Sequence, residues 1–154
     1  MGDEQQLEQN KAIVRRLLEE CLGRGELDRL DALVTADYRQ RDTTLPSGRD
    51  ALKEFFAGFR TAFPDLSVRV EDLVAEGDRV AAVTVSRATQ RGTFSGLPPT
   101  GRHVEFRSMD LYRLADGQIV EHYGRIDELG LLEQLGVKHD LQWPGEPAPS
   151  TPRV

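Results

Sequence analysis

The chain of 154 residues contains a single cysteine, Cys21, and no long apolar run. One cysteine excludes an internal disulfide framework and favours a reducing compartment, so we expect a cytoplasmic protein. No apolar stretch approaches the ~18 residues that a membrane-spanning helix needs. The polar and acidic residues 1–9 do not resemble a signal peptide. We therefore expect neither a membrane-embedded nor a secreted, disulfide-stabilised protein.

Basic residues are also in deficit, with 20 Lys and Arg against 26 Asp and Glu and a net charge of -6. They are scattered along the chain, which argues against a nucleic-acid-binding surface. The three histidines, His103, His122 and His139, lack the spacing of metal ligands, so no metal site is expected. The sequence also lacks a glycine-rich phosphate loop, a nucleotide-binding fingerprint and a nucleophile elbow. We expect no cofactor.

Apolar residues recur at helical spacing in three segments of the N-terminal half. The pattern predicts helices over residues 8–23, 27–34 and 48–63. Cys21 falls on the apolar stripe of the first helix, which indicates a buried, inert thiol rather than a nucleophile. The third helix carries a stripe of phenylalanines. We interpret this stripe mainly as core, with one or two rings, Phe59 among them, lining a pocket.

The remainder of the chain alternates apolar and polar residues in strand-like runs. Strands are predicted over 36–42, 66–75, 79–90, 103–114 and 118–127, followed by a short helix over 128–135. Two prolines and two glycines in Gly96–Arg102 cannot continue a helix or a central strand, so this segment is a shaped connection. Helices followed by antiparallel hairpins are typical of an α+β fold. A sheet curled around a helix leaves an open-ended cone, whose mouth commonly holds a ligand.

The last hairpin suggests a catalytic pair. A turn at Ala115-Asp116-Gly117 places Leu114 opposite Gln118. Counting back two residues at a time then brings Asp110 opposite His122. The same alternation gives this face of the hairpin the side chains of Phe106, Ser108, Tyr112, Gly124 and Ile126. A carboxylate beside an imidazole can act in acid/base chemistry; the alternative is a cross-strand polar pair without a catalytic role.

The order of these elements resembles the SnoaL-like polyketide cyclases, a branch of the nuclear-transport-factor-2-like (ketosteroid-isomerase-like) superfamily. The resemblance covers about residues 8–137 and is carried by the Gly96–Arg102 connection, the Asp116-Gly117 hairpin and the helical ending Asp127–Gly136. It implies a cone-shaped barrel in which a curved, largely antiparallel sheet wraps around three helices of the N-terminal half. It also implies pairing of two copies through the outer face of the sheet, where we expect an apolar patch of Met109, Leu111, Ile119 and Tyr123.

The resemblance implies chemistry as well. Relatives often carry His at the position of Asp110 and Asp at the position of Gly124, and in the polyketide cyclases this pair looks like the acid and base of an intramolecular aldol closure. The implied protein is an enzyme of secondary metabolism that acts on a hydrophobic or aromatic carbonyl metabolite without a cofactor. Cyclisation, isomerisation and related proton transfers are the implied reactions.

Asp110, His122 and Asp127 are therefore the candidate catalytic residues. Asp127 could take the place of the missing aspartate at position 124, or it could cap the last helix. The candidate substrate-binding residues come from several elements, and they are Tyr38, Gln40, Phe59, Gln90 and Phe106. Gln90 stands in a segment, Thr89-Gln90-Arg91-Gly92, that usually reads Thr-His-x-Gly in the family; its amide can bind a carbonyl but cannot shuttle protons.

Two other functions stay open. A non-catalytic ligand-binding or dimerisation domain is favoured by the departures from the family pattern at Arg41, Gln90, Asp110 and Gly124. An epoxide-hydrolase-like enzyme is the other alternative. In domain terms, we expect one SnoaL-like domain over residues 1–137 and a proline-rich, flexible tail over 138–154, where Trp143 could dock the tail.

Overall fold

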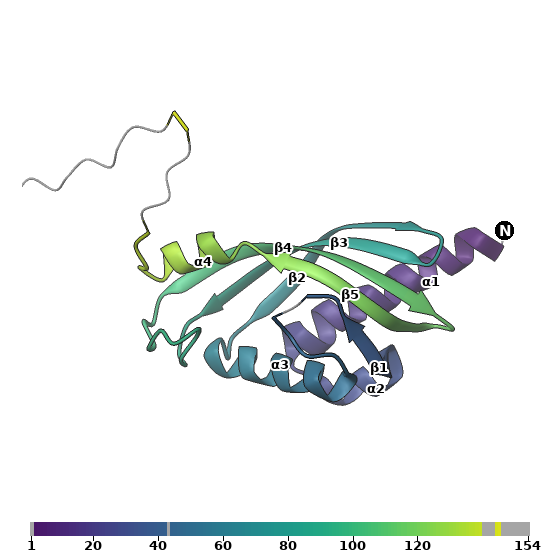
Figure 1. The fold of residues 1–154 in the computed structure, drawn as a ribbon, viewed down its shortest axis with the longest axis horizontal. Coiled ribbons are helices and arrows are strands. Elements are labelled where there is room, and N and C mark those ends of the chain that lie inside the picture. The colour runs from purple at the N-terminus through teal and green to yellow at the C-terminus, as the bar shows by residue number, and fades with distance from the viewer. Residues whose placement is uncertain (1, 43, 140–143, 146–154) are drawn as a thin grey trace, which may run out of the picture.

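The computed structural model describes residues 2–42, 44–139 and 144–145. The first helix, α1 (Gly2–Arg16), continues into a π-helical segment, η1 (Leu17–Leu22). A 3-10 turn, η2 (Leu27–Arg29), and a short helix, α2 (Leu30–Leu33), follow. The remaining elements are β1 (Val34–Gln40), α3 (Arg49–Ala62), β2 (Ser67–Glu76), β3 (Arg79–Thr89), β4 (His103–Ala115), β5 (Gln118–Ile126) and α4 (Glu128–Gln134) (Figure 1).

The strands form one five-stranded sheet in the order β1-β5-β4-β3-β2. Neighbouring strands from β2 to β5 pair antiparallel, whereas β1 joins β5 in parallel. β1 and β2 are the two edges, so the sheet curls without closing into a barrel. The predicted α+β cone with a largely antiparallel sheet is confirmed, and the cone is open along one side.

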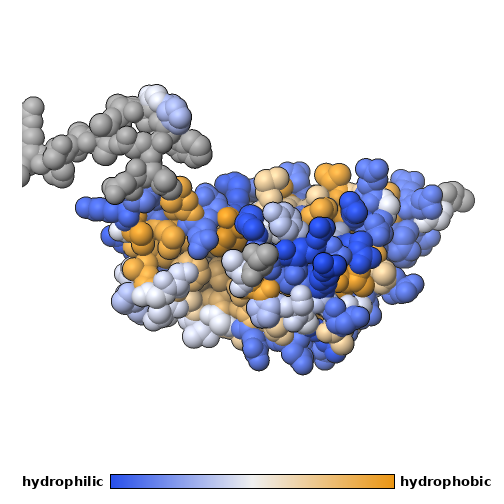
Figure 2. All heavy atoms as spheres, in the orientation of Figure 1, coloured by the Kyte–Doolittle hydropathy of each residue, from blue (hydrophilic) through white to orange (hydrophobic). Residues whose placement is uncertain are grey.

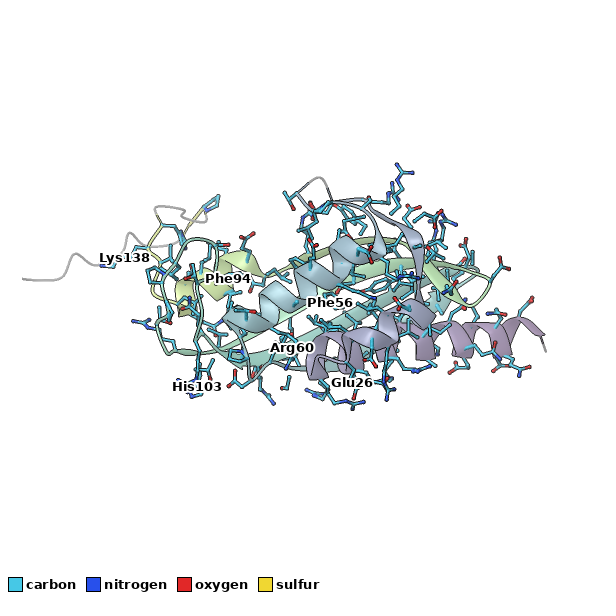
Figure 3. The ribbon with its side chains drawn as sticks, turned by 90° about the horizontal axis from the view of Figure 1, so that it is seen from below. Glu26, Phe56, Arg60, Phe94, His103 and Lys138 are labelled. Atoms are coloured by element: carbon cyan, nitrogen blue, oxygen red, sulfur yellow. The ribbon has the colours of Figure 1, made fainter. Side chains whose placement is uncertain are left out.

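The helices α1 and α3 cover the same face of the sheet (Figure 3). The apolar core lies between them and the strands, because η1 buries Leu17, Leu18 and Cys21 while α3 buries Leu52 and Phe56. Burial of this apolar surface is the main driving force for folding. The three predicted helices are confirmed, although the first begins several residues earlier than its apolar pattern suggested. Its first turns are polar and gain support from acidic residues beside the positive end of the helix dipole.

The β4–β5 hairpin differs from the predicted hairpin in two places. Its turn has two residues, Asp116 and Gly117, with φ values of 51° and 78°, and Ala115 pairs with Gln118. Positive φ at both turn positions is the geometry that Asp-Gly favours, since it matches the twist of the flanking strands. Further along, β5 contains one extra residue, Val120, which has no partner on β4. Such a bulge shifts the pairing by one residue.

Together these two changes move the pairing by two residues. Asp110 lies opposite Gly124 rather than His122, and His122 lies opposite Tyr112. Because side chains alternate faces with a period of two, a shift of two residues leaves the predicted inner face unchanged beyond the bulge. Ile119 precedes the bulge and is fully buried, so its predicted place in the outer patch is wrong.

Among the described residues, no helix is long and apolar enough to cross a membrane. The helix α4 ends at Gln134 and is followed by a glycine in the left-handed region, Gly136, with a φ of 90°. Most of the predicted tail over 138–154, including Trp143, lies outside the described residues. The division into a domain and a flexible tail therefore stays a prediction.

Candidate active site

A cavity of about 390 Å³ lies between the inner face of the sheet and α3. Its volume falls within the range of ~300–1,000 Å³ that is common for ligand sites. Phe59 is central to its apolar wall, since its ring lies 5.8 Å from the ring of Phe94 and 6.1 Å from that of Phe106. Apolar surface also gathers at the end of the molecule where α4 and the β3–β4 connection lie (Figure 2).

The opposite wall of the cavity is polar. Inward-facing positions of four strands supply it with the side chains of Tyr38, Gln40, Thr84, Ser86, Ser108, Asp110, Tyr112 and His122. The predicted substrate-binding residues Phe59, Phe106, Tyr38 and Gln40 thus line the same cavity as the predicted catalytic pair. A ligand in this cavity would lie between an aromatic wall and a wall of hydrogen-bonding groups.

Asp110 and His122 are in direct contact. Their Oδ1 and Nε2 atoms are 2.7 Å apart, and their side chains are only 10% and 16% exposed. They meet diagonally across β4 and β5, because the residue directly opposite Asp110 is Gly124. A Cβ atom at position 124 would lie 2.1 Å from Asp110 Oδ1 and 2.7 Å from His122 Nε2. The glycine therefore leaves the space in which the pair forms.

The other nitrogen of His122 is held by Gln40. Parallel pairing of β1 with β5 puts these two residues side by side, and the distance from His122 Nδ1 to Gln40 Oε1 is 2.9 Å. The same amide oxygen accepts a hydrogen bond of 2.5 Å from the Tyr38 hydroxyl. An amide oxygen only accepts, so Nδ1 of His122 carries a proton and Nε2 faces Asp110. The Tyr112 ring stacks on the imidazole at 4.6 Å and fixes its plane.

On its other side Asp110 is held by the hydroxyl of Ser108, which is in turn bonded to the hydroxyl of Thr84; neither residue was a predicted site residue. Ser108 Oγ donates to Asp110 Oδ2 over 2.7 Å, and Thr84 Oγ1 lies 2.6 Å from Ser108 Oγ. A continuous hydrogen-bonded chain thus runs from Thr84 on β3 to Tyr38 on β1. Ser108 was on the predicted inner face, and Thr84 could have been found by extending the pairing to β3, where it lies opposite Ser108.

Burial dominates the electrostatics of the two tyrosines in the cavity. It raises the pKa of Tyr38 and of Tyr112 well above the usual value, and the nearby Asp110 carboxylate raises both further. Both phenols therefore stay neutral and keep their protons over the physiological range. The neighbours of the pair thus include two neutral phenols, of which Tyr38 bonds Gln40 and Tyr112 stacks on His122.

Residues 12–135 match the sequence profile of the SnoaL-like polyketide cyclases. The chain belongs to the SnoaL-like polyketide cyclase family. It is 30% identical over 117 residues to nogalonic acid methyl ester cyclase of Streptomyces nogalater, an alignment that covers 73% of this chain and 87% of the cyclase. Such relatives support a cyclase-like enzyme with a small-molecule substrate.

Solved structures of family members have the same fold as this chain. IdmH of Streptomyces antibioticus, a candidate polyketide cyclase, superposes with a TM-score of 0.72 at 33% identity, covering 84% of this chain and 99% of IdmH. A candidate SnoaL-like cyclase from Jannaschia sp. CCS1 gives a TM-score of 0.77 at 30% identity, covering 86% of this chain and 94% of that protein. The SnoaL-like cone predicted from the sequence is thereby confirmed.

Gln90, a predicted substrate-binding residue, is surrounded by backbone groups of the connection between β3 and β4. It is fully buried but does not line the cavity. Its Nε2 donates to the carbonyl oxygens of Gly92, Leu97 and Pro98, and its Oε1 accepts from the backbone and hydroxyl of Thr100. The side chain therefore fixes the connection between β3 and β4 instead of pointing at a ligand.

Asp127 also lies apart from the catalytic candidates. It forms the N-cap of α4, where its Oδ1 accepts a hydrogen bond of 3.0 Å from the backbone N–H of Gly130. It is not among the residues that line the cavity. The SnoaL-like site thus brings together Asp110 and His122 but leaves Asp127 at the sheet-to-helix junction. Within the described ranges, no group of three or more His, Cys, Asp or Glu could hold a metal ion.

Proposed function

We propose that this SnoaL-like protein binds a hydrophobic carbonyl metabolite in the cavity and catalyses proton transfer without a cofactor, as a cyclase or isomerase. The observation that carries the proposal is the buried contact of 2.7 Å between Asp110 and His122 in a largely apolar cavity. Isolation from water strengthens each electrostatic interaction within such a site. A cytoplasmic location fits the free, buried thiol of Cys21.

In the proposed reaction Asp110 is the base. Its carboxylate removes a proton from the carbon next to a substrate carbonyl. The electron pair of the broken C–H bond is delocalised onto the carbonyl oxygen, which gives an enolate. His122 holds the Asp110 carboxylate through Nε2, and the amide nitrogen of Gln40 donates to the negatively charged oxygen of the enolate. The Gln40 amide nitrogen has no protein hydrogen-bond partner among the described residues, so it is available to a substrate oxygen.

The second half of the reaction restores the enzyme. In a cyclisation, the enolate carbon attacks a second carbonyl of the same molecule, a carbon–carbon bond forms, and the new alkoxide takes the proton back from Asp110. In an isomerisation, the proton returns to another carbon of the enolate system. Neither route changes the redox state of the substrate, and each leaves Asp110 as a carboxylate.

The proposal is tested by binding first and turnover second. A panel of aromatic polyketide precursors, including nogalonic acid methyl ester, is screened by native mass spectrometry, and the ligands that bind are assayed for conversion. Asp110→Asn should lower turnover by ~10²–10⁴-fold and leave affinity and melting temperature nearly unchanged, because Asn keeps the shape but cannot exchange the proton. His122→Gln should reduce turnover less, since the carboxylate is retained.

Asp127→Asn is the matched control, because it alters an aspartate that follows the same hairpin but lies outside the cavity. We expect it to keep the cap of α4, since Asn and Asp cap helices about equally well, and to preserve turnover. A silent Asp110→Asn combined with an inactive Asp127→Asn would assign catalysis to the other carboxylate. Full activity in both variants would refute the proton-transfer proposal.

A non-catalytic binding domain is the second candidate function. Gly124 supports it, because this position has no side chain where relatives often carry the aspartate of the acid/base pair. Tight binding of panel members without conversion of any of them would favour this reading over the enzyme.

We also propose that the protein is a homodimer paired through the outer face of the sheet. Met109, Leu111 and Tyr123 are 69%, 39% and 47% exposed on this face, and Val74 on β2 is 68% exposed. Pairing brings Val74, Ala81, Leu111 and Tyr123 into one row across the sheet. A second copy could cover this apolar surface.

A further inference from the structure

Two hydroxyls that open into the cavity have no hydrogen-bond partner among the residues that the structure describes. They belong to Ser86 on β3, which is 5% exposed, and Tyr112 on β4, which is 3% exposed, and both side chains line the cavity. The side chains are mostly buried, but their hydroxyls are accessible from the cavity and bond no protein group. They are therefore available to hydrogen-bond a ligand that enters the cavity.

Two neighbouring hydroxyls of the same wall, by contrast, are paired within the protein. Thr84 and Ser108 lie on the same strands and face the same cavity, yet they are bonded to each other and to Asp110 at 2.6 and 2.7 Å. Apart from the Gln40 amide nitrogen, the other polar groups of this wall thus bond one another, whereas the hydroxyls of Ser86 and Tyr112 are left for something that enters the cavity.

The two hydroxyl-bearing residues lie on opposite sides of Asp110 along the strands. Ser86 pairs with Phe106, four residues from Asp110 on β4, which is roughly 13 Å at ~3.4 Å per residue. Tyr112 lies two residues beyond Asp110, at roughly 7 Å. Their hydroxyls therefore meet different parts of a ligand whose reacting carbon is next to Asp110.

We propose that Ser86 and Tyr112 are ligand-binding residues that orient an extended, oxygenated aromatic molecule by hydrogen bonds on either side of the Asp110–His122 pair. The proposal rests on the proposed function in taking this cavity as the ligand site. The aromatic wall around Phe59 holds the ring system, and the two hydroxyls select ligands with oxygen atoms at separate positions. Ser86, which is distant from the reacting groups, sets the direction in which the ligand enters.

Binding of two probes tests the proposal. One probe is 1,8-dihydroxyanthraquinone, and the other is anthracene, which has the same three fused rings without oxygen. Ser86→Ala and Tyr112→Phe should each raise the dissociation constant for the hydroxyanthraquinone about three- to tenfold. Both should leave the dissociation constant for anthracene unchanged. The matched controls are Ser67→Ala and Tyr123→Phe, which remove exposed hydroxyls and should alter neither value.

Melting temperatures of the ligand-free variants separate ligand binding from a structural role. Removing a hydroxyl that bonds no protein group should leave the melting temperature nearly unchanged. The stabilisation that the hydroxyanthraquinone gives should nevertheless be smaller in both variants than in the parent. A fall in the ligand-free melting temperature, unchanged affinity for the oxygenated probe, or failure of the parent to bind that probe would each overturn the proposal.

The same titrations on Asp110→Asn distinguish this inference from the proposed catalysis. The variant should bind the hydroxyanthraquinone with parental affinity, because Asp110 acts on the reacting carbon and the two hydroxyls set the binding. If the protein shows the expected losses in Ser86→Ala and Tyr112→Phe yet converts none of the panel ligands, the catalytic proposal fails and the binding role of the hydroxyls stands.

Discussion

At the scale of single residues, the space left by Gly124 decides whether Asp110 and His122 can meet. Gly124→Ala would put a methyl group 2.1 Å from the present position of Asp110 Oδ1. The carboxylate must then move, so we expect turnover to fall about a hundredfold or more, because small displacements of a catalytic group are costly. Overpacking of this kind also costs roughly 1–3 kcal/mol of stability.

The control for this prediction is Gly58→Ala. Gly58 lies in the middle of α3, and a Cβ atom there meets nothing within 4 Å. Alanine should be neutral or should stabilise the helix by about 0.5–1 kcal/mol. Steady-state kinetics and thermal melting of the two variants test the pair of expectations. Parental turnover in Gly124→Ala would show that the contact does not limit the reaction.

Cys21 gives a prediction about pH. Burial, with help from Glu20 and Glu26, raises the pKa of this thiol from 9.0 to about 11. The unfolded chain therefore loses the thiol proton at a lower pH than the folded protein does. The contribution of Cys21 to stability should be full below about pH 9 and should decline as the pH rises towards 11, by up to about 3 kcal/mol.

Urea unfolding at pH 8 and pH 10.5 measures this decline. Cys21→Ala should show a smaller difference between the two midpoints than the parent, although alanine itself lowers stability by leaving a cavity. Labelling with iodoacetamide at pH 8 should be far slower in the folded than in the unfolded protein. Equal pH dependence of the parent and Cys21→Ala would contradict the assigned shift.

At the scale of elements, the β3–β4 connection depends on one side chain. Gln90→Ala would leave the buried carbonyl oxygens of Gly92, Leu97 and Pro98 without their donor. We expect a loss of about 2–3 kcal/mol in the free energy of unfolding and faster amide exchange in this connection. Gln5→Ala, at an exposed position of α1, should change neither. Weaker ligand binding without loss of stability would return Gln90 to its predicted role in binding the substrate.

The β4–β5 hairpin shows which structural features the sequence pattern could predict and which it could not. Alternation along the strands was sufficient to put Asp110, His122 and Ser108 on one face. It could not reveal the bulge at Val120, because a bulge depends on how two strands fit around the core rather than on their composition. For the same reason Ile119 was predicted on the wrong face, while the residues beyond the bulge were predicted correctly.

At the scale of the molecule, the order of helices and hairpins predicted the cone, since apolar periodicity marks each element and sheet curvature follows from covering α1 and α3. The positions that differ from the family pattern indicated the site less clearly. Asp110 and Gly124, each considered alone, suggest that the acid/base pair of the relatives has been lost. Only the three-dimensional contact shows that an imidazole and a carboxylate still meet. The hydrogen bonds of Gln90 could not be predicted, because its partners belong to a connection whose path no local pattern encodes.

The assembly can be tested at the same scale. Sedimentation at micromolar concentration should show a dimer, and Met109→Glu should shift it to monomer, because the substitution buries a charge in the proposed interface. Leu129→Glu is the control, since Leu129 is an exposed apolar residue on α4, away from this face. A monomeric parent would contradict the homodimer.

Exchange of substrate protons in D₂O tests the central claim most directly, because it reports proton removal even when no ring closes. A carbonyl ligand that binds in the cavity is incubated with the protein, and deuterium at the carbon next to its carbonyl is followed by NMR or mass spectrometry. We predict that the parent accelerates incorporation and that Asp110→Asn loses ~10²–10⁴-fold of this acceleration while binding the ligand equally well. Equal rates of exchange in the parent and in Asp110→Asn would contradict proton transfer by the Asp110–His122 pair.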